Sequence, residues 1–180
     1  MALLSSSASA KCTDIDSCRE EGERRFEEME RAMGPVVSLS DGVRYRELKT
    51  GEGREIRPGD VCDLRFQVLK GNGDFMYSVP NREPGSERKD LAETLRVTVG
   101  NKDVPEGVED ALIGAKKGTV RRVELPPSKG FATSDWRPEP VGYAGIQRMK
   151  RFRSLLSGNG LQPGYDAVII FEFDIVRIKK

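Results

Sequence analysis

Polar and apolar residues alternate along several short stretches of this chain. In the stretch 61–69, polar residues lie between apolar ones, which are Cys62, Leu64, Phe66 and Val68. A period of two is that of a β-strand with one buried face, so Phe66 should point into a core. The stretch 95–99 repeats this alternation, and 43–48, 75–78 and 120–125 also have strand character. The pattern therefore predicts a sheet of short strands.

Glycine and proline mark the turns between these stretches. Pro58-Gly59-Asp60 places a residue of fixed φ beside one of free φ, and Gly71-Asn72-Gly73-Asp74 has the chemistry of a hairpin turn. Residues 80–90 are too polar for a core element, so we expect a surface loop there. Gly118 turns the chain into the strand 120–125, which Pro126-Pro127 ends.

One short helix is expected between two of the strands. Asp103 and Glu106 have the spacing of a capping box, with Pro105 at the first helical position. The apolar residues on one side of this helix should face the sheet; they are Val108, Ala111 and Leu112. Lys116 and Lys117 follow, where cations favour the negative end of a helix. Strands with a short helix predict an α+β fold.

Two further helices have a charged character. Residues 16–35 carry Glu and Arg three and four positions apart, a spacing that supports an exposed helix by ion pairing. Its thin apolar stripe either docks on the parent domain or recruits a partner; the stripe consists of Phe26, Met29 and Met33. The stretch 145–160 predicts a basic amphipathic helix that ends at Gly158-Asn159-Gly160. Its apolar side would hold Ile146, Met149, Phe152 and Leu156.

Composition excludes several classes of protein. A length of 180 residues suits one ordinary domain with extensions. The 30 Lys and Arg nearly cancel the 29 Asp and Glu, so no whole-protein field attracts nucleic acid or membrane. No apolar run approaches the roughly 18 to 20 residues that cross a bilayer. The chain has no histidine, the commonest metal ligand and general base, so we expect neither a metal site nor a cofactor.

The first ten residues leave two interpretations open. Ala8-Ser9-Ala10 matches the A-x-A rule for signal-peptide cleavage, which would make Lys11 the first mature residue; the alternative is a disordered Ser/Ala tail. A cleaved leader implies an exported or lumenal compartment, where Cys12 and Cys18 could form a disulfide; otherwise they are a free, exposed pair. The expected segments are a leader remnant or tail at 1–10, a charged helical extension at 11–35 and one domain at 36–180.

A series of short motifs, in order along the chain, resembles FK506-binding-protein-type (FKBP-type) peptidyl-prolyl isomerases. The motifs are Asp41-Gly42-Val43, Gly51-Glu52-Gly53, Pro58-Gly59-Asp60, the strand with Phe66, Gly100 through Val104-Pro105-Glu106-Gly107, Gly118, Arg121-Arg122, Leu125-Pro126-Pro127 and residues 167–173. The series covers most of residues 37–180. The resemblance implies a curved antiparallel sheet wrapped around one short helix, with the ligand pocket between them. It also identifies residues 132–163 as an insertion beside the pocket mouth.

The resemblance implies a mechanism without nucleophile or metal. In this family a dry aromatic cavity binds the X-Pro bond in a twisted form, which offsets part of a barrier of roughly 18 to 20 kcal/mol. The positions that match this X-Pro pocket are Phe66, Met76, Tyr77, Leu95, Val104, Pro105, Val108, Phe131 and Phe171.

Five of these positions depart from the family pattern. Phe131 replaces a tyrosine, Met76 and Leu95 replace aromatic residues, Tyr77 replaces an aspartate that hydrogen-bonds the ligand region, and Val108 replaces the tryptophan that forms the floor. Because valine cannot supply the rigid surface of an indole, catalysis should suffer. We therefore expect weak or absent isomerase activity in a protein that assists folding or assembly of partners. The alternative is a non-catalytic subunit of a larger thylakoid complex. The retained Phe66, Phe131 and Phe171 support the competing interpretation of an active folding enzyme.

The insertion and the leader bear on partners and compartment. Four cations of the insertion are either solvated on a loop-capping helix or dock on an acidic protein or an anionic membrane surface; they are Arg148, Lys150, Arg151 and Arg153. Nucleic acid is not expected, because aromatic interleaving is slight. We expect protein clients or a protein complex as partners. The A-x-A end, the cysteine pair and the single extended domain resemble family members of the chloroplast thylakoid lumen, which predicts that compartment.

Overall fold

The structure, a computed structural model, describes residues 14–32, 34–39, 42–81, 92–130, 136–156 and 168–179. The chain divides into two compact units, Met1–Gly34 and Pro35–Lys180. The first unit contains helix α1 (Ile15–Ala32), which carries ion pairs one turn apart, such as Arg19–Glu23 at 3.0 Å. This is the charged helix that the sequence predicts. The side chains of its proposed apolar stripe, Phe26, Met29 and Met33, lie outside the described residues.

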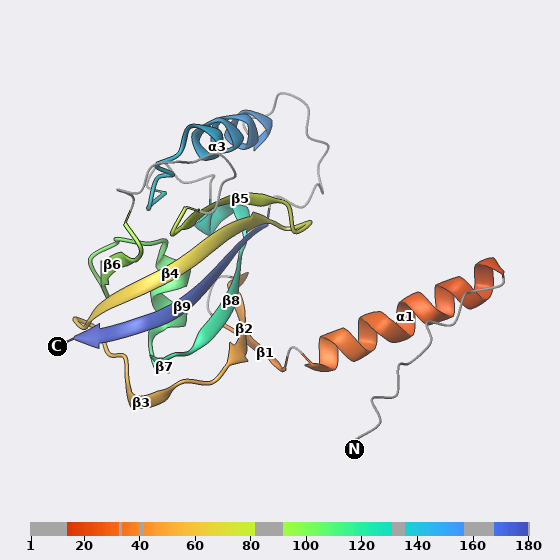
Figure 1. Cartoon of the computed structure of the whole chain (residues 1–180), viewed down its shortest axis with the longest axis horizontal. Coiled ribbons are helices and arrows are strands. Elements are labelled where there is room, and N and C mark those ends of the chain that lie inside the picture. Colours follow the sequence, from red (N-terminus) through yellow and green to blue (C-terminus); the bar gives the residue numbers. More distant parts are fainter. Residues whose placement is uncertain are drawn as a thin grey trace, which may run out of the picture. The chain divides into compact units, whose positions relative to one another are not determined.

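A curved antiparallel sheet forms most of the second unit (Figure 1). Its strands are β1 (Val36–Ser38), β2 (Arg44–Lys49), β4 (Val61–Lys70), β5 (Phe75–Val79), β6 (Leu95–Thr98), β8 (Val120–Leu125) and β9 (Ile169–Lys179). Their spatial order is β1-β2-β8-β9-β4-β5, and β6 pairs with β4. A separate two-stranded sheet joins β3 (Glu52–Glu55) to β7 (Lys116–Lys117). The predicted α+β fold with a curved antiparallel sheet is therefore confirmed.

Helical elements accompany the sheet. Helix α2 (Glu106–Leu112) packs against β8, and α3 (Tyr143–Leu156) packs against β5. A short 3-10 turn, η2 (Pro127–Lys129), follows β8. In Figure 1, α2 (green) lies behind β4 and β9, and α3 (blue) lies beyond β5. The sheet thus curves around one short helix, and a second helix, from the insertion, covers its β5 edge.

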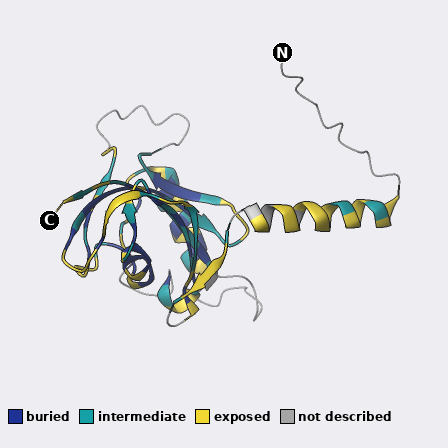
Figure 2. Ribbon diagram, turned by 90° about the horizontal axis from the view of Figure 1, so that it is seen from below, coloured by how far each residue is buried: buried dark blue, intermediate teal, exposed yellow. Residues whose placement is uncertain are grey.

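The core lies between α2 and the sheet. Val108, Ala111 and Leu112 of α2 are fully buried, as their helical spacing predicts. Buried residues recur along the strands in Figure 2, because successive side chains of a strand point to opposite faces. Gly107 permits the close approach of α2: a Cβ atom at this position would lie 2.7 Å from Val43 Cγ2 and 2.8 Å from Leu125 Cδ2.

The capping box predicted for α2 is wrong. The helix begins at Glu106 with Pro105 as its N-cap, and no side chain caps it. The carboxylate of Asp103 instead accepts hydrogen bonds from the backbone of Thr98 at 2.9 Å and from the side chain of Asn101 at 3.1 Å. Thr98 is the last residue of β6, and Asn101 lies in the turn between β6 and α2. Local turn hydrogen bonds therefore take the carboxylate from the helix.

The cation at the C-terminal end of α2 is not the one that the sequence predicts. Lys116 and Lys117 form strand β7 instead of a last helical turn. Arg121, from β8, donates to the carbonyl oxygen of Ala111 at 2.7 Å and to that of Ile113 at 3.3 Å. Its guanidinium also pairs with Glu47 at 2.9 Å. The negative end of the helix is thus neutralised by a buried arginine from a strand.

Candidate functional site

Aromatic rings from three strands meet between the sheet and α2. Phe66 of β4 and Phe171 of β9 are stacked, with ring centroids 4.8 Å apart and an angle of 16° between the rings. Tyr77 of β5 meets Phe66 edge-on, with centroids 5.9 Å apart. The register explains this, because Val68 pairs with both Tyr77 and Phe171 and lies two residues from Phe66. We call Phe66, Tyr77, Phe171 and Trp136 (described next) the ring cluster.

Trp136 enters this cluster from the insertion. Its side chain is 2% exposed, and its indole lies 6.4 Å from the ring centroid of Phe171. Trp136 Nε1 donates a hydrogen bond to Tyr77 Oη at 2.8 Å, and the Tyr77 hydroxyl donates to the carbonyl oxygen of Pro138 at 2.6 Å. Burial raises the pKa of the Tyr77 hydroxyl, so it remains a neutral donor and acceptor. The insertion thus closes the cluster with an indole and two hydrogen bonds.

Most of the predicted pocket positions come together in one buried core. The core that contains Phe66 and Phe171 also includes Met76, Tyr77, Val104, Val108 and Trp136. Leu95 is partly buried against it, and Pro105 is buried at the start of α2. Phe131 lies outside the described residues. These residues lie close enough together to form one wall of a pocket. The part of these residues in ligand binding remains a prediction.

Sequence reasoning missed the part of Trp136 in this cluster. Residues 132–163 were expected to lie beside the pocket mouth, whereas Trp136 is part of the core. One signal was available: the chain has a single tryptophan, and it lies in the insertion, while the floor position holds Val108. A tryptophan missing from the expected floor position and present in the insertion indicates that the insertion could reach the core. That signal indicates a contact and not its geometry.

A small hollow borders the ring cluster at Trp136. It has a volume of about 180 Å³ and is lined by Lys102, Val104, Pro105, Glu106, Ser128, Lys129 and Trp136. Lys129 Nζ and Glu106 Oε2 form an ion pair at 3.0 Å in its lining. Sites for small molecules usually measure roughly 300–1,000 Å³. The space beside Trp136 is therefore smaller than an ordinary ligand pocket.

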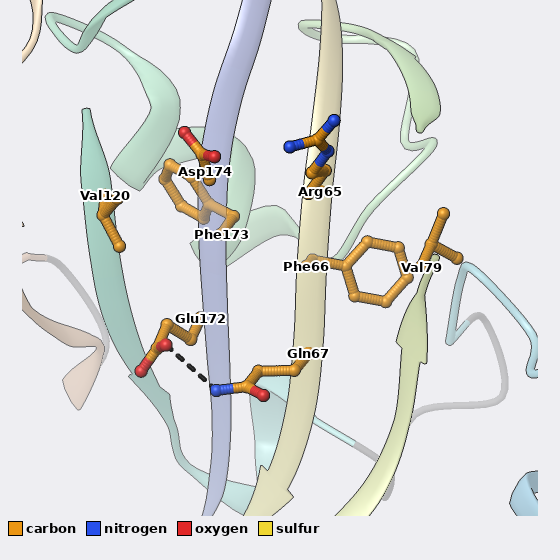
Figure 3. A pocket seen from close by; sticks show the side chains of 8 residues that line it. All are labelled: Arg65, Phe66, Gln67, Val79, Val120, Glu172, Phe173 and Asp174. Carbon is orange, nitrogen blue, oxygen red and sulfur yellow. Dashed lines mark hydrogen bonds between the residues drawn. The ribbon is translucent and has the colours of Figure 1, made fainter. Parts of the chain in front are cut away.

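A second hollow, of about 130 Å³, lies over strands β4, β5, β8 and β9 (Figure 3). Its polar lining comes from Arg65, Gln67, Glu172 and Asp174, which alternate with core residues. Gln67 Nε2 donates to Glu172 Oε1 at 3.0 Å, and Arg122 Nε donates to Glu172 Oε2 at 2.9 Å. Both oxygens of the Glu172 carboxylate therefore accept cross-strand hydrogen bonds, which gives this residue a structural role.

The four cations of the insertion do not share one environment. Arg148 faces the sheet: it donates to the carbonyl oxygen of Met76 at 3.0 Å, and its guanidinium lies 5.6 Å from the ring centroid of Phe75. Arg153 lies 3.4 Å from Glu139. Lys150 and Arg151 are exposed. The structure therefore separates two anchoring arginines from two exposed cations.

The described cysteines and acidic residues do not form a metal site. Cys62 is fully buried, as predicted, and burial raises the pKa of its thiol to about 11. Cys18 is exposed on α1, while Cys12 lies outside the described residues, so their pairing stays a prediction. Across the described ranges, no three His, Cys, Asp or Glu residues gather in a way that could hold a metal ion. None of the described helices is long and apolar enough to cross a membrane.

A curved sheet around a short helix, with aromatic rings between them, defines a domain of the prolyl-isomerase class. Residues 53–172 match the family model of FKBP-type peptidyl-prolyl cis-trans isomerases. This match spans most of the chain, and the chain belongs to that family.

Curated relatives and solved structures agree with this assignment. Two Arabidopsis thaliana proteins, named as the chloroplastic peptidyl-prolyl cis-trans isomerases FKBP16-1 and FKBP19, are 30% and 28% identical over 143 and 147 residues. Each alignment covers 79% of this chain, but only 61% and 55% of the relative. A peptidyl-prolyl isomerase from Pseudomonas syringae has a TM-score of 0.51 at 16% identity, covering 94% of this chain and all of its own. The wheat FKBP73 domains have a TM-score of 0.51 at 20% identity, covering 81% and 50%. At these identities the structures show the fold alone.

Proposed function

We propose that this chain is an FKBP-type isomerase-like protein with weak or no isomerase activity, which assists the folding or assembly of partner proteins. The observation that carries this proposal is the buried side chain of Trp136, which packs against Phe171 inside the ring cluster. A cavity filled by the chain's own indole has no room to hold a proline in a twisted state. The substitutions at Tyr77 and Val108 act in the same direction.

The energy needed to open the cluster supports weak activity. An entering proline must displace Trp136, whose burial stabilises the closed form by about 1.5–3 kcal/mol. Its hydrogen bond to Tyr77 adds about 1 kcal/mol. Because each 1.4 kcal/mol is a factor of ten in affinity, these terms weaken substrate binding by roughly 100-fold. Catalysis then requires an X-Pro segment with unusually strong contacts elsewhere on the protein.

A protease-free assay of X-Pro peptide isomerisation tests the proposal. We expect kcat/KM of the full chain to lie at least about 100-fold below that of an open-pocket family member, from the displacement energy above. Trp136→Ala should bring a modest gain, since Val108 and Tyr77 remain. Tyr143→Ala, which removes an aromatic side chain that is 78% exposed, is the matched control and should leave the rate unchanged. Turnover by the unaltered chain that equals an ordinary family member would refute the proposal.

The compartment belongs to the same proposal. We place the protein in the chloroplast, and within it in the thylakoid lumen. Support comes from the chloroplastic relatives and from the A-x-A pattern at Ala8-Ser9-Ala10. Sequencing the N-terminus of the native protein is the test. A mature start at Lys11 after an upstream two-part leader supports the lumen, and a native start at Met1 counts against it.

A second candidate function is that of a non-catalytic subunit of a larger thylakoid complex. The observation that favours it is the exposed basic surface of α3, where Lys150 and Arg151 face solvent. Affinity purification from the native source with mass spectrometry separates the two candidates. A stable stoichiometric complex supports the subunit, whereas a scatter of transient clients supports the folding helper.

A further inference from the structure

Helix α3 uses its apolar side to pack on the domain. Met149 is 2% and Phe152 is 4% exposed, and both belong to the core that contains the ring cluster. Arg148 fixes the helix to β5 through its hydrogen bond to the carbonyl oxygen of Met76. Because these apolar residues are already buried, they are not available for insertion into lipid.

The outward side of α3 carries uncompensated positive charge. Residues 143–156 contain four cations and no carboxylate. Lys150 and Arg151 are exposed, and no carboxylate of the described residues pairs with either of them. Such exposed cations raise the local concentration of anionic partners. The whole chain has a formal net charge of only +1, so this attraction is local to α3.

A groove runs between α3 and the β4–β5 hairpin. It has a volume of about 330 Å³ and is lined by Lys70, Asp74, Phe75, Arg148, Arg151 and Phe152. Asp74 is its one carboxylate, and it is paired with Lys70 at 3.1 Å. Arg151 is exposed, and no described carboxylate neutralises it. Of the two aromatic side chains in the lining, Phe75 is the more accessible, because Phe152 is only 4% exposed.

We propose that this α3–β5 groove binds an acidic segment of a partner protein, with an aromatic residue of that segment against Phe75 and a carboxylate on Arg151, while Lys150, beside the groove, adds to the local positive charge. Guanidinium groups bind carboxylates through paired hydrogen bonds. The groove has room for about one large side chain and its neighbours, at the lower end of ordinary binding cavities. The buried apolar side of α3 favours a protein over a membrane as the occupant.

This surface is separate from the ring cluster, and it provides the partner contact that the proposed function requires. The two proposals therefore fail separately. If the groove binds no acidic segment, the isomerase assay on the same protein still decides whether the pocket is closed. If the chain proves to be an active isomerase, binding at the groove still decides the present inference.

Fluorescence anisotropy with a labelled peptide tests the inference on the full chain. The probe is a nine-residue peptide of Asp and Glu around a central Phe, and its matched form has Ala in place of Phe. We expect saturable binding, weakened at least tenfold in Lys150→Glu/Arg151→Glu and severalfold by the Ala form of the peptide. The matched control Lys49→Glu/Lys117→Glu reverses two exposed cations elsewhere and should bind within about twofold of the unaltered chain.

Three results would overturn the inference. The first is no binding of the peptide by the unaltered chain. The second is equal loss of binding in both charge-reversal variants, which would indicate a general charge effect. The third is binding to vesicles containing phosphatidylglycerol without binding to the peptide, which would make a membrane the partner. Circular dichroism of each variant confirms that the fold is intact.

Discussion

The Tyr77 hydroxyl is the polar centre of the closed ring cluster. It accepts from Trp136 Nε1 and donates to Pro138, so a strand residue holds two residues of the insertion. The phenol ring also packs edge-on against Phe66. At the position where the family resemblance predicts a ligand-binding aspartate, the tyrosine thus binds the chain itself. Its new role follows from the hydroxyl at the end of a long apolar ring.

Tyr77→Phe should destabilise the protein by about 1–3 kcal/mol, because it removes the hydroxyl that accepts from the buried indole N–H and donates to the Pro138 carbonyl. Urea unfolding measures this difference. Tyr143→Phe removes a hydroxyl from a side chain that is 78% exposed and should have little effect. Equal stability of the two variants would show that the hydrogen bonds to Tyr77 do not hold the cluster.

Asp63 should make the protein sensitive to acid. Its buried carboxylate pairs with Arg96 at 2.9 Å and with Arg177 at 2.6 Å, and the hydrogen bond from Arg96, followed by that from Arg177, holds the pKa of Asp63 below its ordinary value. A carboxyl whose pKa is lower in the folded state stabilises the fold above the unfolded pKa, about 3.9. This stabilisation disappears as the pH falls through the folded-state pKa.

Asp63→Asn should therefore lower the free energy of unfolding by about 1.5–3 kcal/mol at pH 7. It should also flatten the loss of stability between about pH 5 and pH 2, since the titrating group is gone. Denaturant unfolding across this pH range is the measurement, with the exposed Asp110→Asn as control. An unaltered pH profile in Asp63→Asn would contradict the assignment.

Pocket residues on strands could be predicted from the sequence, and Trp136 could not. Phe66 lies in a period-two pattern that fixes its face, and Phe171 follows from the family motif. Trp136 precedes α3 in a segment without periodicity, so no local rule gives its direction. Its place depends on packing against Phe171 and on the Tyr77 hydroxyl, which are contacts between distant parts of the chain.

At the scale of elements, the approach of α2 to the sheet depends on a missing side chain. Gly107→Ala would place a methyl group within 3 Å of Val43 and Leu125, so we expect a loss of about 1–3 kcal/mol from overpacking. Thermal or urea unfolding measures it. Gly22→Ala is the matched control, because nothing lies within 4 Å of that position in α1 and alanine favours a helix. A harmless Gly107→Ala would mean that α2 can move away from the sheet.

The existence of α2 was predictable, but its ends were not. Helical spacing of Val108, Ala111 and Leu112 gives the buried side directly. The capping box fails because the Asp103 carboxylate accepts from the backbone of Thr98, at the end of β6, and from the side chain of Asn101. The C-terminal cation comes from Arg121 on a strand, which a rule restricted to neighbouring residues cannot find. Helix ends thus depend on tertiary partners, whereas the buried side depends on spacing alone.

At the scale of the whole molecule, the alternation of polar and apolar residues predicts which face of a strand is buried. It does not predict which strands pair with each other. Strands β4 and β9 form the long central pair although about 100 residues separate them in sequence, from Val61–Lys179 to Lys70–Ile169 in register. The resemblance to the FKBP-type family implied a curved antiparallel sheet, and the structure gives the order of its strands. The structure shows the family fold retained, with the insertion built into both the ring cluster and the β5 edge.

The single tryptophan gives the most direct test of whether the pocket is closed. Trp136 is the chain's only indole, so intrinsic fluorescence reports this one site. The closed cluster predicts blue-shifted emission, weak quenching by acrylamide and no change when an X-Pro peptide is added in large excess. The chain unfolded in guanidinium provides the fully exposed reference. Emission and quenching close to that reference, or a shift that saturates with the peptide, would show an open pocket and contradict the account.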